Sequence, residues 1–173
     1  MEAAEFLKLH HEGKKDFSRV DLQGIHLRHA HLDEIILAGA NLSDADLSGA
    51  SLFAADLHGA ALNRAHLGMA HDSATDPNLD DIDIELDSTN LAKANLQGAL
   101  LIDAHMFAAN LQDADLTNAD LRYAHLRRVN LIGAKLTGAN LSFADLTGAH
   151  VNKDTLAHAN TTEAKMNGLI LHE

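Results

Sequence analysis

Histidine is the residue type in this chain best suited to binding a metal ion or moving a proton, and the sequence contains 13 of them. His26, His29 and His31 lie close together, and His125 follows His105 after a few short repeats of the sequence. Either group offers imidazole ligands to a metal ion. Several of the histidines, however, occupy a position that other segments fill with Asn or Asp. The simpler interpretation is surface substitution, so we predict no metal site and no cofactor.

Acidic residues are concentrated in one segment. Residues 71–89 contain seven Asp and Glu and no Lys or Arg, which accounts for −7 of the net charge of −12. Acidic and apolar residues alternate near the end of this segment, which is typical of a strand with one acidic face. The acidic candidates for partner binding are Asp76, Asp80, Asp81, Asp83, Glu85 and Asp87.

Three interpretations of this acidic segment remain open. It is a solvated insertion, a loop that binds a partner, or a calcium site. Calcium is the weakest of the three, because the order of the acids lacks the Gly and the terminal Glu of a calcium-binding loop.

A small basic group lies further along the chain, at Arg122, Arg127 and Arg128. These residues are candidates for receiving an acidic segment of a partner, including the acidic loop of a second molecule. The alternative is a solvated basic face.

Catalytic motifs are missing from the sequence. The chain has no Cys, which excludes thiol catalysis and cysteine-ligated metals. It also contains no phosphate-binding loop, nucleophile elbow or zinc-protease helix motif. We therefore predict that the protein is not an enzyme.

A pentapeptide period runs along the chain, and it must position all of these side chains. Leu fills 24 of 29 positions spaced five apart from Phe17 to Leu67 and from Leu86 to Leu171. Ala usually stands two places before each of these positions, and the place between usually holds Asn, Asp or His. Nine of the 11 Gly stand two places after them. The unit is Ala-(Asp/Asn)-Leu-x-Gly.

A period of five fits neither a continuous helix nor a continuous strand. In a helix the Leu side chains would scatter around the axis, and in a strand they would alternate between faces. The pattern fits if Ala and Leu point inward from an extended segment and the next two positions turn a corner, where Gly is favoured. The chain is then expected to coil, with neighbouring coils hydrogen-bonded like strands.

The segments Ala40-Asn41-Leu42, Ala45-Asp46-Leu47 and Ala139-Asn140-Leu141 resemble the pentapeptide-repeat family. The resemblance implies an all-β fold, a right-handed quadrilateral β-helix of about seven coils with a pentapeptide on each of the four sides of a coil. Equivalent positions of successive coils should then stack, so we expect Asn90, Asn110 and Asn130 to form a ladder of amides. The N-terminal segment resembles cyanobacterial members in particular.

We expect a single domain over residues 1–173 with four parts. Residues 2–12 have the apolar spacing of a short helix that caps the first coil. Repeat blocks cover 15–70 and 86–171, and the acidic loop 71–85 lies between them. Asp154 occupies a position usually held by Ala, which predicts irregular last coils. The apolar run around Ile170 leaves end capping and end-to-end homodimerisation open.

Charge and composition limit the class of partner. A net charge of −12 argues against direct nucleic-acid binding and favours a partner with a basic surface. Nothing near Met1 resembles an export signal and no apolar run is long enough for a membrane, so we expect a soluble, cytoplasmic protein. The leading hypothesis is a non-catalytic scaffold for protein–protein interaction. The alternative, implied by the resemblance, is a DNA mimic that inhibits or protects DNA gyrase, a type II topoisomerase.

Overall fold

The computed structural model describes residues 1–68 and 88–173. The acidic candidates Asp76, Asp80, Asp81, Asp83, Glu85 and Asp87 lie outside the described residues, and so does Leu86, the expected start of the second repeat block. The predictions of a partner-binding or calcium-binding loop therefore stay predictions.

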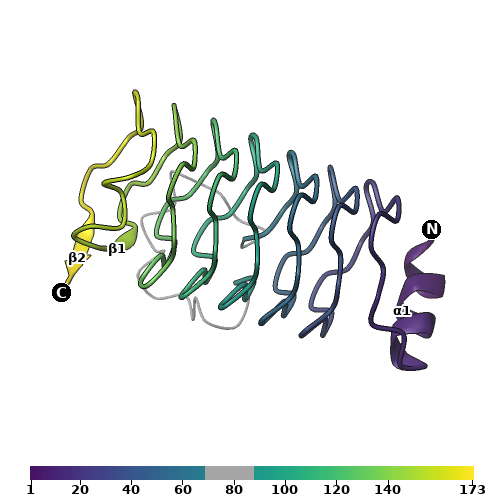
Figure 1. Ribbon diagram of the computed structural model, residues 1–173. Helices are drawn as coiled ribbons and strands as arrows, with labels where there is room; N and C mark the ends of the chain where they lie inside the picture. The colour runs from purple at the N-terminus through teal and green to yellow at the C-terminus, as the bar shows by residue number, and fades with distance from the viewer. Residues whose placement is uncertain (69–87) are drawn as a thin grey trace, which may run out of the picture.

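The chain winds into a rod of stacked coils, as Figure 1 shows. Outward residues pair in parallel with the equivalent residue of the next coil, as in Asp16 with Ile36 and Asn110 with Asn130. Across the undescribed segment the partner lies further along the chain, as in Ser51 with Asn90, yet the pairing continues in the same order. The coils therefore keep their register on both sides of this segment. Where the chain is continuous, equivalent residues such as Asn110 and Asn130 are 20 positions apart, which confirms the predicted four pentapeptides per coil.

Leu and Ala fill the inside of the coils. Leu42, Leu101 and Ala109 have no exposed surface, and the same holds for most of the other inward residues. Each fully buried Leu stabilises the fold by about 1.5 to 3 kcal/mol. Thr89 is a polar residue at an inward position, and its hydroxyl donates a hydrogen bond of 2.9 Å to the Leu47 carbonyl oxygen. The core is thus a continuous column of small and branched apolar side chains.

The corners of the repeat are tight turns. The N–H of the next inward residue donates to the carbonyl oxygen of the inward residue before the corner, as in Ala40 to Leu37 at 2.9 Å. The second corner residue has a positive φ, which is the mark of a type II turn. Gly39 adopts 64°, but Arg64 adopts 55° and Tyr123 adopts 62°. Gly is therefore favoured at the corners, as predicted, without being required there.

Helix α1 (Ala3–His11) closes the N-terminal end of the rod (Figure 1). Phe6 is fully buried, and its ring centroid lies 4.4 Å from that of Phe17 in the first coil. Gly13 leaves the helix with a φ of 94°, a conformation that favours Gly. The expected helix and its position over the first coil are confirmed. Among the described residues, no helix is long and apolar enough to cross a membrane.

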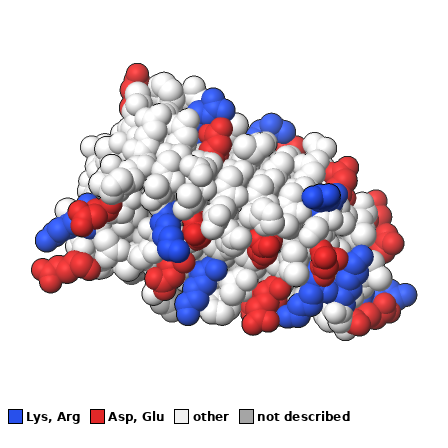
Figure 2. Space-filling model, viewed as in Figure 1, with Lys and Arg blue, Asp and Glu red and all other residues white. Residues whose placement is uncertain are grey.

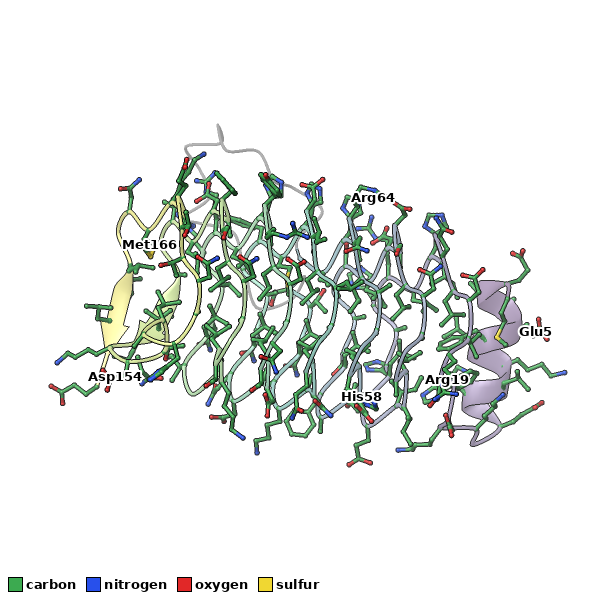
Figure 3. All side chains as sticks on the ribbon, turned by 45° about the horizontal axis from the view of Figure 1, so that its top comes forward. Glu5, Arg19, His58, Arg64, Asp154 and Met166 are labelled. Carbon is green, nitrogen blue, oxygen red and sulfur yellow. The ribbon has the colours of Figure 1, made fainter. Side chains whose placement is uncertain are left out.

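The C-terminal coil departs from the repeat. Strand β1 (His150–Asn152) pairs in parallel with strand β2 (Ile170–His172), in register at Val151 and Leu171. Between them, residues 153–158 form turns, and Asp154 is exposed at this end of the rod (Figure 3). The predicted irregularity is confirmed. Its physical cause is that the Asp154 carboxylate cannot occupy the apolar inside of a coil. Leu171 remains 59% exposed, since no described coil follows it.

Candidate functional site: a groove along one corner of the rod

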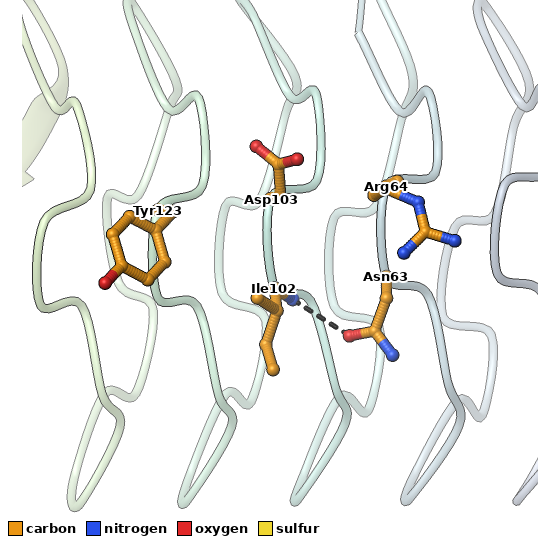
Figure 4. Close-up of a pocket in the computed structure, with 5 residues that line it drawn as sticks. All are labelled: Asn63, Arg64, Ile102, Asp103 and Tyr123. Carbon is orange, nitrogen blue, oxygen red and sulfur yellow. Dashed lines mark hydrogen bonds between the residues drawn. The ribbon is translucent and has the colours of Figure 1, made fainter.

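Corner residues from three successive coils line an open groove of about 580 Å³. Its walls are formed by Asn63 and Arg64, by Ile102 and Asp103 of the next coil, and by Tyr123 of the coil after that (Figure 4). We call this stack of turns the Arg64–Tyr123 corner, with residues 43–44, 63–64, 102–103, 122–123 and 142–143. The coil spacing thus brings together side chains that are far apart in the sequence.

Hydrogen bonds hold one end of the groove. The Asn63 carboxamide oxygen accepts a hydrogen bond of 3.1 Å from the N–H of Ile102 (Figure 4). Arg64 donates two hydrogen bonds of 2.8 Å to the carboxylate of Asp44, one coil earlier. These bonds from Arg64, followed by one from Gln23, lower the pKa of Asp44. The guanidinium is therefore oriented by a bidentate ion pair.

A pair of exposed aromatic rings begins at the groove wall and extends along the corner. The rings of Tyr123 and Phe143 stack with centroids 5.1 Å apart and planes within 7°. Tyr123 is 52% exposed and Phe143 is 43% exposed, both in the left-handed backbone conformation that holds them outward. Aromatic residues and Arg are enriched in protein interfaces and dominate their binding energy. This corner therefore has the composition of an interaction surface.

The predicted basic group is divided between two corners. Arg122 lies on the Arg64–Tyr123 corner and donates from Nε and Nη2 to the carboxylate of Asp120, at 2.9 and 2.8 Å. Its hydrogen bond is the largest cause of the lowered pKa of Asp120. Arg127 and Arg128 follow the inward Leu126 and so belong to the neighbouring corner. There Arg128 lines a second groove with His150 and Ile170. Their role in partner binding stays a prediction.

Stacked histidines occupy the face that adjoins the groove. The rings of His66 and His105 have centroids 4.8 Å apart, and those of His105 and His125 are 4.6 Å apart. His125 Nε2 lies 3.3 Å from a carboxylate oxygen of Asp103, which also lines the groove. The stacking of His105 on His125 agrees with the expectation that equivalent positions of successive coils stack. His26, His29 and His31 join no group of three metal-ligating side chains among the described residues.

A family model for pentapeptide repeats matches the chain in eight copies, over residues 16–52, 37–68, 84–122 and 114–152. The chain belongs to the pentapeptide-repeat family. Members of this family fold as right-handed quadrilateral β-helices, in agreement with the parallel pairing of successive coils. They are in general scaffolds without catalytic activity. No curated protein matches the chain.

Solved structures of pentapeptide-repeat proteins resemble the chain. HetL of the cyanobacterium Nostoc sp. strain PCC 7120, involved in heterocyst differentiation regulation, is 25% identical, with 98% of this chain and 94% of that chain covered and a TM-score of 0.49. Rfr23 of the cyanobacterium Cyanothece 51142 is 21% identical, with coverage of 99% and 97% and a TM-score of 0.34. The plasmid-mediated fluoroquinolone resistance protein QnrB1 is 15% identical, with coverage of 92% and 88% and a TM-score of 0.47.

The groove and the aromatic pair were not found from the sequence. The signal was present, because Tyr123 and Phe143 are one coil length apart and both follow an inward Leu by two positions. The same holds for Asp44 and Arg64. Comparing the corner positions of successive coils would have placed these pairs side by side.

Proposed function

We propose that this protein is a non-catalytic interaction protein that binds a partner protein along the Arg64–Tyr123 corner. The observation that carries the proposal is the exposed Tyr123–Phe143 stack beside an open groove. Such a pair remains largely exposed to water in the free protein, and burial against a partner would remove that apolar surface from water. The groove supplies a place for one projecting side chain of the partner.

The charge of the chain supports a partner with a basic surface. Acidic and basic side chains are interspersed on the face seen in Figure 2, with a wide uncharged band above them. The described residues carry −5 of the net −12, because residues 69–87 hold seven acids and no Lys or Arg. We place the apolar contact at the corner and expect the acidic segment to add long-range attraction. We also propose a cytoplasmic location.

Affinity capture from lysate of the source organism tests this proposal with two variants. The first variant, Tyr123→Asn with Phe143→Asn, removes the aromatic pair and keeps the fold, since Asn readily adopts the left-handed conformation. The second variant replaces Asp80, Asp81, Asp83 and Glu85 with Asn or Gln. The matched control is Lys93→Asn, which changes an exposed residue with a φ of 59° on a different corner.

We expect a partner that is captured by the wild type and the Lys93→Asn control and lost from the aromatic variant. Loss of partner capture in the acidic-segment variant alone would contradict binding at the Arg64–Tyr123 corner. It would indicate instead that the partner binds residues 69–87. Capture of a type II topoisomerase through the acidic segment would support the DNA-mimic hypothesis instead.

A further inference from the structure

Three metal-ligating side chains converge at one place on the rod. One ligand atom from each of Asp103, His105 and His125 lies within 4.8 Å of the other two. Among residues 1–68 and 88–173, this is the one group of three or more such side chains found. We propose that these residues bind a divalent transition-metal ion of the zinc class. The proposal is independent of the function proposed above.

The backbone holds the three residues in place. Asp103 is a corner residue with a φ of 58°, a conformation that Asp tolerates better than most residues. His105 follows two positions later as an outward residue of the same coil, and it pairs in parallel with His125 of the next coil. Since parallel strands lie about 4.8 Å apart, the two imidazoles start close to the spacing that a shared ion needs.

Small side-chain rotations complete the site. Zinc binds imidazole nitrogen and carboxylate oxygen at about 2.0 to 2.2 Å, so the ligand atoms must approach one another by a modest amount. All three side chains are partly exposed and have room to rotate about their χ angles. His125 Nε2 already faces the Asp103 carboxylate at 3.3 Å, and the His66 ring supports the far side of His105 by stacking.

The ligand set defines the class of ion. Two imidazoles and one carboxylate suit Zn²⁺, Ni²⁺ and Cu²⁺, whereas Mg²⁺ and Ca²⁺ prefer oxygen ligands throughout. Three protein ligands leave a fourth tetrahedral position for water. The ligands come from two successive coils, so a bound ion would tie these coils together and favour the folded state.

Titration of metal-free protein with Zn²⁺ against a chromophoric chelator tests the proposal, with Co²⁺ absorption as a report of tetrahedral geometry. We expect one tight site per chain. His105→Asn and Asp103→Asn should each weaken Zn²⁺ binding by about 100-fold or more, since even residues behind the ligands contribute about 10- to 100-fold in metal sites. Asn suits both positions, because it occupies the matching outward position at Asn110 and a left-handed corner at Asn118.

Two control variants separate this cluster from the other surface histidines. His26→Asn changes a histidine at the equivalent outward position of an earlier coil, outside the cluster. His172→Asn disrupts the separate stack of His150 and His172. Both should retain the Zn²⁺ affinity and the increase in melting temperature on adding Zn²⁺, and His105→Asn should lose both. Equal losses in all variants, or binding that never saturates at one ion per chain, would overturn the proposal.

Discussion

At the residue scale, the outward Asp and Asn side chains each stabilise the turn that follows them. Their Oδ1 atoms accept a hydrogen bond from the N–H two positions later, as in Asn130 to Ile132 at 3.1 Å and Asp145 to Thr147 at 3.0 Å. This is the Asx turn, in which a side chain imitates a backbone acceptor. The preference for Asp and Asn at this position therefore has a local cause as well as the ladder between coils.

The Asp residues at these outward positions make the stability of the fold depend on pH. At Asp120 the hydrogen bond from the Arg122 side chain, and then other contacts of Arg122, lower the pKa below the ordinary value of 3.8 against an opposing effect of burial. A lowered folded-state pKa adds stability above the unfolded value, and this stability is lost as pH falls through the folded value. The pKa of Asp44 is also lowered, mainly by its hydrogen bonds from Arg64, so this carboxylate contributes to stability in the same way.

We predict that Asp120→Asn reduces the loss of stability in acid. The amide keeps an oxygen that accepts from the Arg122 N–H, but it has no proton to take up. Thermal unfolding followed from about pH 5 to about pH 2 measures the effect. The melting temperature of the wild type should fall more steeply below about pH 4 than that of the variant. Parallel curves would show that this carboxylate contributes nothing to the acid response.

At the element scale, the two ends of the rod differ. Helix α1 covers the first coil through Phe6, whereas the inward Leu171 of the last described coil is largely exposed. The glutamate and lysine side chains of α1 point away from the rod, as Glu5 does in Figure 3. The buried Phe6 ring, together with Ala3, Leu7 and Leu9 packed against the core, therefore holds the cap in place.

We predict that Phe6→Ala destabilises the protein by about 3 to 5 kcal/mol, the usual cost of removing a buried aromatic ring. Lys8→Ala is the matched control on the exposed face of the same helix and should change stability by less than about 0.5 kcal/mol. Denaturant unfolding measures both. A similar small change for both variants would mean that α1 does not cap the core.

The repeat pattern in the sequence predicts the core and the amide ladder, but it does not predict the groove. The period of five predicted the inward Leu and Ala, and the amide ladder is present, with Asn110 and Asn130 each donating 3.3 Å hydrogen bonds to the preceding Asn. The departure at Asp154 was also predictable, because the side chain conflicts with an apolar core. The groove was not predictable, because Asn63 and Ile102 are 39 positions apart across residues 69–87, so the period does not show that they meet.

At the scale of the whole molecule, the rod presents rows of side chains at a fixed spacing. Each coil contributes one side chain to every row, so a substitution at one corner position changes a row without disturbing the core. Tyr123 and Phe143 make one row apolar, and His66, His105 and His125 make the adjoining face rich in imidazole. Asp103 lies between these two surfaces and contributes to both.

Site-specific photo-crosslinking in lysate of the source organism tests most directly whether a partner binds along the Arg64–Tyr123 corner. A photoreactive phenylalanine analogue is placed at Tyr123, and in a matched control at Lys93 on another corner. We predict that the analogue at position 123 crosslinks one defined partner and that the analogue at 93 does not. Equal crosslinking from both positions, or no defined product from position 123, would contradict a partner bound along this corner.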